Sequence, residues 1–119
     1  MRVLLLGATG TIGLATARAL ITSGHDLVCF IRPRQDAKGG ESEDRMTSDL
    51  KGSTIRYGEL TDPVSIARDG FANESFDAVI SCMASRTGSP RDAWRIDYQA
   101  HMDALEAAQA HGVKHFVLL

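Results

Sequence analysis

Three glycines at a spacing of three residues form the most chemically informative pattern in the chain. They lie in the stretch Gly7-Ala8-Thr9-Gly10-Thr11-Ile12-Gly13, between an apolar strand-like run and a helical pattern. A strand, a glycine loop and a helix in this order bind the pyrophosphate of a dinucleotide, because the glycines permit a tight turn, a close approach of the backbone to the phosphates and close packing of the helix. The N–H groups at the helix N-terminus then point at the phosphates. We predict a dinucleotide site that includes Gly7, Thr9, Gly10, Thr11, Ile12 and Gly13; the alternative is a strand-to-helix turn that binds nothing.

The residues after the second predicted strand indicate which dinucleotide is bound. Sites for NAD usually place an Asp or Glu there to hold the ribose 2′-hydroxyl. This chain instead reads Phe30-Ile31-Arg32-Pro33-Arg34, and a guanidinium can form paired hydrogen bonds with a 2′-phosphate that a carboxylate would repel. Arg32 is the first candidate and Arg34 the second, with the Thr11 hydroxyl beside them. The pattern favours NADP(H) over NAD(H); the alternative is that both arginines are solvated loop charges.

Two further candidate loops follow the third and fourth predicted strands, since open parallel sheets bind their ligands at the carboxyl ends of strands. Asp62 is placed to hydrogen-bond the adenine amino group, with Leu60 packing on the ring, and Asp62 could equally cap a helix. After the fourth strand, small residues let the chain pass close to a ribose and a nicotinamide. The candidates there are Met83, Ala84 and Ser85.

The long helical pattern near the C-terminus carries Asp97, Tyr98 and His101. Asp97 and His101 are one helical turn apart, so they can meet on one face as an acid–base pair; a solvated or capping face is the alternative. Tyr98 is followed four residues later by Met102, so this helix lacks the Tyr-x-x-x-Lys pair of dehydrogenases. Because this fold binds the reacting group largely with segments after the fifth strand, we expect the catalytic residues to lie beyond Leu119. We also expect residues 1–119 alone to bind the cofactor weakly or not at all and to show no turnover.

Alternating strands and helices are expected to position these residues. Apolar runs predict strands at residues 2–6, 26–31, 54–57, 76–83 and 116–119, separated by helical patterns at about 11–23, from 63 onward and at about 91–111. This alternation indicates an α/β Rossmann fold, a doubly wound parallel sheet with strand order 3-2-1-4-5. The apolar residues that share one side of the first helix are Ile12, Ala15, Ala19 and Leu20. Those expected to be buried on the long helix are Trp94, Ala100, Leu105 and Ala108.

Length and composition limit the classes of protein that fit. The 119 residues suit one domain, so we expect 1–119 to be an NAD(P)-binding domain. Because the last predicted strand ends in apolar residues with no covering helix after them, we expect this domain to be the N-terminal part of a longer enzyme. A net charge of −2 gives no reason to expect a nucleic-acid partner, since such binding depends on a basic face. No apolar run approaches the about 20 residues that span a membrane and no targeting peptide precedes the first strand, so we expect a cytoplasmic protein.

These motifs together resemble the extended and atypical short-chain dehydrogenase/reductase superfamily. The similarity rests on the glycine loop, Arg32, the Gly-Glu-Leu-Thr-Asp stretch at 58–62 and the Glu-Ala-Ala-Gln-Ala-His-Gly-Val-Lys-His-Phe-Val stretch at 106–117. Branches of this superfamily leave two alternatives to a reductase. One is an NmrA-like protein that senses NADP without turnover, and the other is a nucleotide-sugar epimerase or dehydratase.

Residues 77–88, continued by residues 92–100, form a more distinctive pattern. It resembles the 8-vinyl reductase family of (bacterio)chlorophyll biosynthesis, whose members carry a Ser-Cys-x-Ala-Ser-Arg-x-Gly loop and an Asp-x-Trp-x-Ile-Asp-Tyr helix start. This resemblance implies NADPH as the hydride donor and a magnesium porphyrinoid as the small-molecule substrate. It also implies that an acid from outside this chain protonates the second vinyl carbon.

Overall fold

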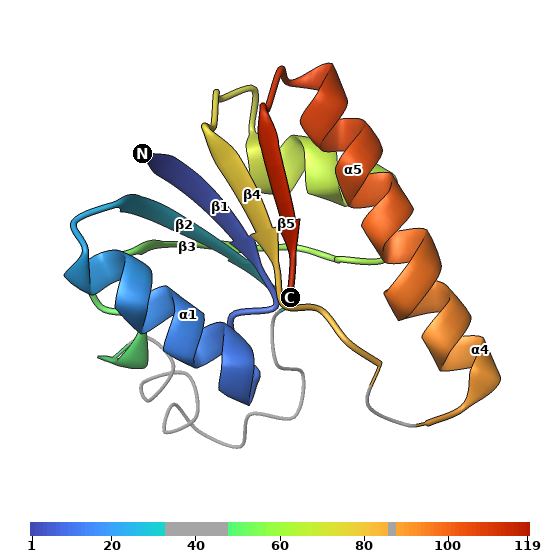
Figure 1. Cartoon of the computed structure of the whole chain (residues 1–119). Helices are drawn as coiled ribbons and strands as arrows, with labels where there is room; N and C mark the ends of the chain where they lie inside the picture. Colours follow the sequence, from blue (N-terminus) through green and yellow to red (C-terminus); the bar gives the residue numbers. More distant parts are fainter. Residues whose placement is uncertain (33–47, 86–87) are drawn as a thin grey trace.

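The computed structural model describes residues 1–32, 48–85 and 88–119 and confirms the predicted parallel sheet (Figure 1). The strands, parallel in every pairing, are β1 (Arg2–Leu6), β2 (Asp26–Ile31), β3 (Thr54–Tyr57), β4 (Ala78–Ser81) and β5 (His115–Leu118). The chain runs β1–β2–β3 to one side of β1 and then returns to β4 on its other side, so the strand order reverses between β1 and β4. The carboxyl ends of β1 and β4 therefore form the topological switch point of a Rossmann-like sheet. The order of the strands across the sheet is β3-β2-β1-β4-β5, as the sequence predicted.

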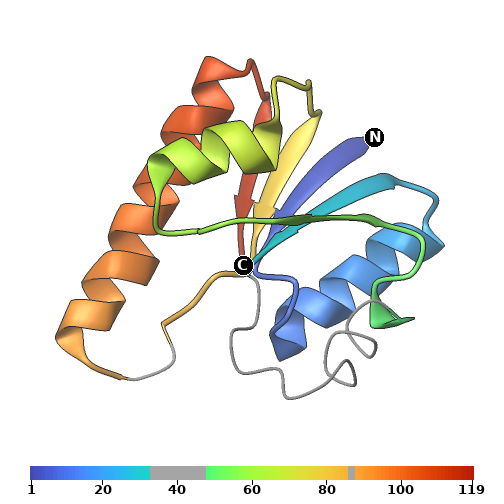
Figure 2. The ribbon, with the colours of Figure 1, turned by 180° about the vertical axis from the view of Figure 1, so that it is seen from behind.

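Helix α1 (Thr11–Thr22) covers one face of the sheet, and two helical segments cover the other (Figures 1 and 2). The first of these two segments consists of α3 (Pro63–Ser65) and the π-helical η1 (Ile66–Phe71). The second is a long helix that continues without a break through α4 (Pro90–Ala93), the π-helical η2 (Trp94–Ala100) and α5 (His101–Ala110). The order of helices and strands thus matches the alternation expected from the sequence.

Both faces of the central strands are buried against these helices. In β1, Val3 and Leu5 belong to the core on the α1 side, whereas Leu4 and Leu6 belong to the core on the side of η1 and α5. Successive side chains of a strand point to opposite faces, so a strand that is covered on both sides needs an unbroken apolar run. Residues 27–31 of β2 satisfy the same requirement, and all of them are buried.

Helix α1 presents a different face to the sheet from the one expected. Ile12 is 64% exposed, and Ala15 and Ala19 are exposed too, although Leu20 does pack against the core. The buried residues are Gly13 and Ala17. Close packing of Gly13 against the glycine loop sets the rotation of the helix about its axis, and this rotation turns Ile12 outward.

The prediction that Trp94 is buried is also wrong. Its side chain is 62% exposed and stacks on Tyr98, with 4.6 Å between the ring centroids. The face of the long helix that meets the sheet is made of Ala100, Ala104 and Ala108, all buried, whose small side chains let the helix lie close to the strands. Trp94 lies outside this row.

Cys29 and Cys82 are free thiols; Cys29 is buried and Cys82 is half-buried. Burial raises the pKa of the Cys29 thiol, and the Ser53 hydroxyl partly offsets this effect. Among residues 1–32, 48–85 and 88–119, no helix combines the length and the apolar character that a bilayer crossing requires.

Candidate functional site

The first glycine of the loop brings the end of β1 against the chain that leaves β4. Gly7 has a φ of +81°, a conformation that residues with a side chain rarely adopt. A Cβ at this position would lie 2.8 Å from the carbonyl carbon of Cys82 and 2.8 Å from the amide nitrogen of Met83. In addition, the Cys82 N–H donates a hydrogen bond to the Leu6 carbonyl over 2.8 Å. The loop after β1 and the segment after β4 are therefore in direct backbone contact at the switch point.

The other two glycines shape the beginning of α1. A Cβ at Gly13 would overlap the carbonyl oxygen of Gly7, so only glycine lets the helix lie this close to the loop. Gly10 is the N-cap residue, with extended backbone (φ −80°, ψ 172°). It supplies no side-chain acceptor to the first helical N–H groups, and the first turn contains no acidic residue. Thr9, Thr11 and Ile12 are exposed beside it.

This arrangement fits the phosphates of a dinucleotide. The glycines form a cradle that a Cβ would fill, and the helix end above it has no side-chain cap of its own. Amide N–H groups at such a helix end favour an anion through both hydrogen bonding and the helix dipole.

Arg32 follows β2 directly and is exposed. Because β1 and β2 are adjacent and parallel, Arg32 lies at the same edge of the sheet as the glycine loop. No hydrogen bond or ion pair connects it to another residue in the described part of the chain. Arg34, by contrast, lies outside the described residues.

Asp62 is a helix cap, one of the two roles that the sequence left open. Its carboxylate accepts a hydrogen bond of 3.0 Å from the Val64 N–H, and Pro63 occupies the first helical position. Leu60, which precedes this cap, is half-buried and packs against the core on the η1 side. Both residues lie in the loop after β3, and their roles toward an adenine ring stay predictions.

The segment that begins with the last residue of β4, here called the β4 exit segment (residues 81–85), is held by polar contacts from the long helix. Met83 is buried in the core, Ala84 is exposed, and Ser85 is half-buried. The Ser85 N–H donates to one carboxylate oxygen of Asp97 and the Ser85 hydroxyl donates to the other, each over 2.9 Å. The pKa of Asp97 is lowered, chiefly by the hydrogen bond from the Ser85 N–H. The Ser85 hydroxyl and the nearby His101 lower this pKa further.

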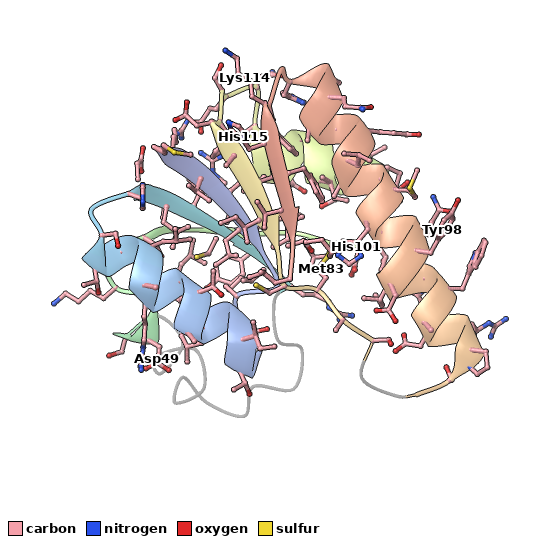
Figure 3. The ribbon with its side chains drawn as sticks, in the orientation of Figure 1. Asp49, Met83, Tyr98, His101, Lys114 and His115 are labelled. Atoms are coloured by element: carbon pink, nitrogen blue, oxygen red, sulfur yellow. The ribbon has the colours of Figure 1, made fainter. Side chains whose placement is uncertain are left out.

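A second contact joins the start of this segment to the same helix. The Ser81 side chain is fully buried, and its Oγ lies 2.6 Å from His101 Nε2. The Met83 N–H also donates to Ser81 Oγ, over 3.3 Å. Figure 3 shows His101 and Met83 next to each other where the chain leaves the sheet. The sequence did not predict the contact between Ser81 and His101. The one signal for it is that Ser81 is a polar residue at the end of an otherwise apolar strand.

Asp97 and His101 do not form the acid–base pair that their spacing allowed. The Asp97 carboxylate binds Ser85, whereas the His101 ring contacts the backbone carbonyl of Asp97, with 3.2 Å between Nδ1 and the oxygen. The two residues therefore share one face of the helix, and both contact the β4 exit segment.

A Rossmann-like sheet with a glycine cradle at its switch point defines a dinucleotide-binding domain. Residues 3–119 match the family described as the NAD dependent epimerase/dehydratase family, and the chain belongs to this family. The resemblance to short-chain dehydrogenases/reductases is thereby confirmed.

Several curated relatives carry names from chlorophyll and photosystem biology. The chain is 38% identical over 117 residues to divinyl chlorophyllide a 8-vinyl-reductase, chloroplastic, of Oryza sativa subsp. indica, an alignment that covers 98% of this chain and 29% of the relative. It is 32% identical over 119 residues to photosystem II assembly factor Ycf39 of Synechocystis, covering 98% of this chain and 32% of that protein. The chain thus spans about a third or less of the length of these relatives. Because the plant relatives are described as chloroplastic, the expected cytoplasmic location stays a prediction.

Solved structures of the same fold include UDP-glucose 4-epimerase from Bifidobacterium longum, with a TM-score of 0.77 and 20% identity, covering 99% of this chain and 36% of that one. Uronate dehydrogenase from Agrobacterium tumefaciens superposes with a TM-score of 0.71 and 18% identity, covering 98% of this chain and 39% of that one. At this level of identity the likeness establishes the fold alone.

Proposed function

We propose that this chain is the NADP(H)-binding part of a reductase that reduces the 8-vinyl group of a divinyl chlorophyllide. The observation that carries the proposal is the 38% identity, over nearly the whole chain, to a relative named for that reaction. The distinctive stretch at 77–88 and 92–100 lies within the aligned region. The glycine cradle and the uncapped end of α1 support the binding of a dinucleotide.

In this proposal each loop at the carboxyl edge of the sheet has a separate task. Residues 7–13 hold the pyrophosphate, and Leu60 and Asp62 contact the adenine. The β4 exit segment, through Met83, Ala84 and Ser85, lies along the nicotinamide and its ribose. When bound, NADPH supplies the hydride, and the residues of this chain contribute by positioning it against a flat porphyrinoid.

Arg32 is proposed to select NADP(H) by binding the 2′-phosphate, with Arg34 as a second contact. Charge-assisted hydrogen bonds to one phosphate contribute roughly 1.5–3 kcal/mol, so Arg32→Ala should weaken NADPH binding by about tenfold to a hundredfold. NADH has no 2′-phosphate, and its affinity should stay unchanged.

The control for that experiment is Arg95→Ala, which removes an exposed arginine from the long helix. Dissociation constants of both nucleotides, measured in the full-length protein, test the assignment. Equal affinities of the natural protein for NADPH and NADH, or the same NADPH affinity in Arg32→Ala and Arg95→Ala, would contradict it.

The substrate is tested by incubating the full-length protein with NADPH and divinyl chlorophyllide. Oxidation of NADPH with matching conversion of the vinyl group to ethyl is the expected result. If neither compound is consumed, the reductase proposal fails.

A second candidate is a protein that binds NADP(H) without turning it over. The 32% identity to photosystem II assembly factor Ycf39 favours this alternative. It predicts tight NADPH binding in the same assay, with no oxidation when divinyl chlorophyllide is added.

A further inference from the structure

Two residues of the long helix grip the two ends of the β4 exit segment. Asp97 binds the N–H and the hydroxyl of Ser85 at its far end. His101, one turn later, binds the Ser81 hydroxyl at its near end. Four sequence positions thus separate the two contacts on the helix, and four separate them on the segment.

The hydrogen bonds at Ser81 have a defined direction. The Asp97 carbonyl oxygen can only accept, so the Nδ1 atom that faces it carries the proton. In a neutral ring Nε2 is then an acceptor, and the Ser81 hydroxyl donates to it while accepting from the Met83 N–H. The buried hydroxyl has a partner for each role, which makes this end of the segment rigid.

The β4 exit segment, which these contacts hold, also borders the glycine loop. A Cβ at position 7 would lie 2.8 Å from backbone atoms of Cys82 and Met83, closer than Cβ atoms normally approach other atoms. A shift of the segment would therefore change its distance to the loop. Hydride transfer depends on the position of the reacting carbon, and a misplacement of about 1 Å can slow a reaction about a hundredfold.

We propose that Asp97 and His101 are positioning residues that clamp the β4 exit segment and thereby set the position of the nicotinamide. This inference rests on the proposed function, because it takes residues 83–85 as the part that borders the nicotinamide. Neither residue exchanges a proton with the substrate in this proposal. They act through Ser85 and Ser81.

The test separates the nicotinamide end of the cofactor from its phosphate end. NADPH and 2′-phospho-ADP-ribose, which lacks the nicotinamide, are titrated against the full-length protein and its Asp97→Ala and His101→Ala variants. Loss of one or two hydrogen bonds should weaken NADPH binding by about fivefold to thirtyfold and leave 2′-phospho-ADP-ribose binding unchanged. The fluorescence of the bound reduced nicotinamide should move toward that of free NADPH.

Conservative variants provide the rescue. In Asp97→Asn the amide oxygen can accept from the Ser85 N–H and the amide nitrogen can donate to its hydroxyl, and in His101→Gln the amide can bind Ser81. Both should restore NADPH affinity and fluorescence. Glu106→Ala, which removes an exposed carboxylate from the same helix, is the matched control and should behave like the natural protein.

Two outcomes would overturn the clamp while leaving the proposed function intact. In the first, both alanine variants bind NADPH with the same affinity and the same nicotinamide fluorescence as the natural protein. The other is a parallel loss of affinity for both ligands, which indicates a general structural role. A natural protein that binds neither ligand would instead refute the proposed function, and the clamp proposal with it.

Discussion

Replacing Gly7 with alanine tests whether the glycine loop and the β4 exit segment need backbone contact. The new Cβ would lie 2.8 Å from two backbone atoms of residues 82 and 83 and 2.9 Å from a third, the Cys82 carbonyl oxygen. These atoms belong to main chain that is hydrogen-bonded to β1, so they cannot move aside as a flexible side chain would. The substitution therefore combines backbone strain at a φ of +81° with overpacking.

The two contributions can be separated with matched variants. Gly24 and Gly112 also have positive φ values, of +82° and +71°, but a Cβ at either position meets nothing within 4 Å. Left-handed backbone costs an alanine roughly 1–2 kcal/mol, and the reduced entropy of the unfolded chain offsets about 0.4–1 kcal/mol. Gly24→Ala and Gly112→Ala should thus lose at most about 1.6 kcal/mol. Gly7→Ala carries an additional overpacking cost of about 1–3 kcal/mol.

The assay is urea unfolding of the three variants and the natural protein at pH 7, analysed by linear extrapolation with the slopes compared. We expect Gly7→Ala to be about 1–3 kcal/mol less stable than both control variants, with an unchanged slope. If Gly7→Ala is no less stable than Gly24→Ala and Gly112→Ala, the close approach is not needed and the reasoning fails.

Two predictions concern the remainder of the scaffold. The Arg56 guanidinium, and to a lesser extent that of Arg2, lowers the pKa of Glu74. The stability from this interaction is complete above the unfolded value, about 4.3, and is lost as the pH falls through the lower folded value. Glu74→Gln should therefore destabilise the protein at pH 7 and flatten the decline of its urea midpoint below about pH 4.3, and an unchanged acid profile would contradict this. Asp62→Ala should cost about 1 kcal/mol by removing the helix cap, and Asp62→Ser should recover most of it; equal urea midpoints for the two variants would exclude the capping role.

The features that could be predicted from the sequence are those that neighbouring residues determine. The strands at 2–6, 26–31 and 54–57 have the bounds that were expected, because an apolar run between turn residues has few other conformations in a parallel sheet. The strand order follows from right-handed crossovers. The glycine loop is likewise local, since its spacing encodes a turn and a close approach within a few residues.

The features that could not be predicted depend on contacts between distant parts of the chain. The rotation of α1 is set by the approach of Gly13 to Gly7 rather than by the apolar residues of the helix. The helical periodicity therefore predicted incorrectly that Ile12 faces the sheet. The contact between Ser81 and His101 joins residues 20 positions apart. Nothing in the spacing of Asp97 and His101 indicates that their side chains reach the β4 exit segment instead of each other.

The two ends of the proposed cofactor site are coupled through one backbone contact, and this gives the Gly7 variant a second, distinct expectation. Because Gly7 lies in the phosphate loop and also touches residues 82 and 83, an alanine there should displace both the loop and the β4 exit segment. Gly7→Ala should therefore weaken NADPH and 2′-phospho-ADP-ribose together, whereas Asp97→Ala should weaken NADPH alone. The difference between these two patterns separates damage to the phosphate cradle from misplacement of the nicotinamide. Identical patterns for the two variants would mean that the cradle and the clamp are not separate parts of the site.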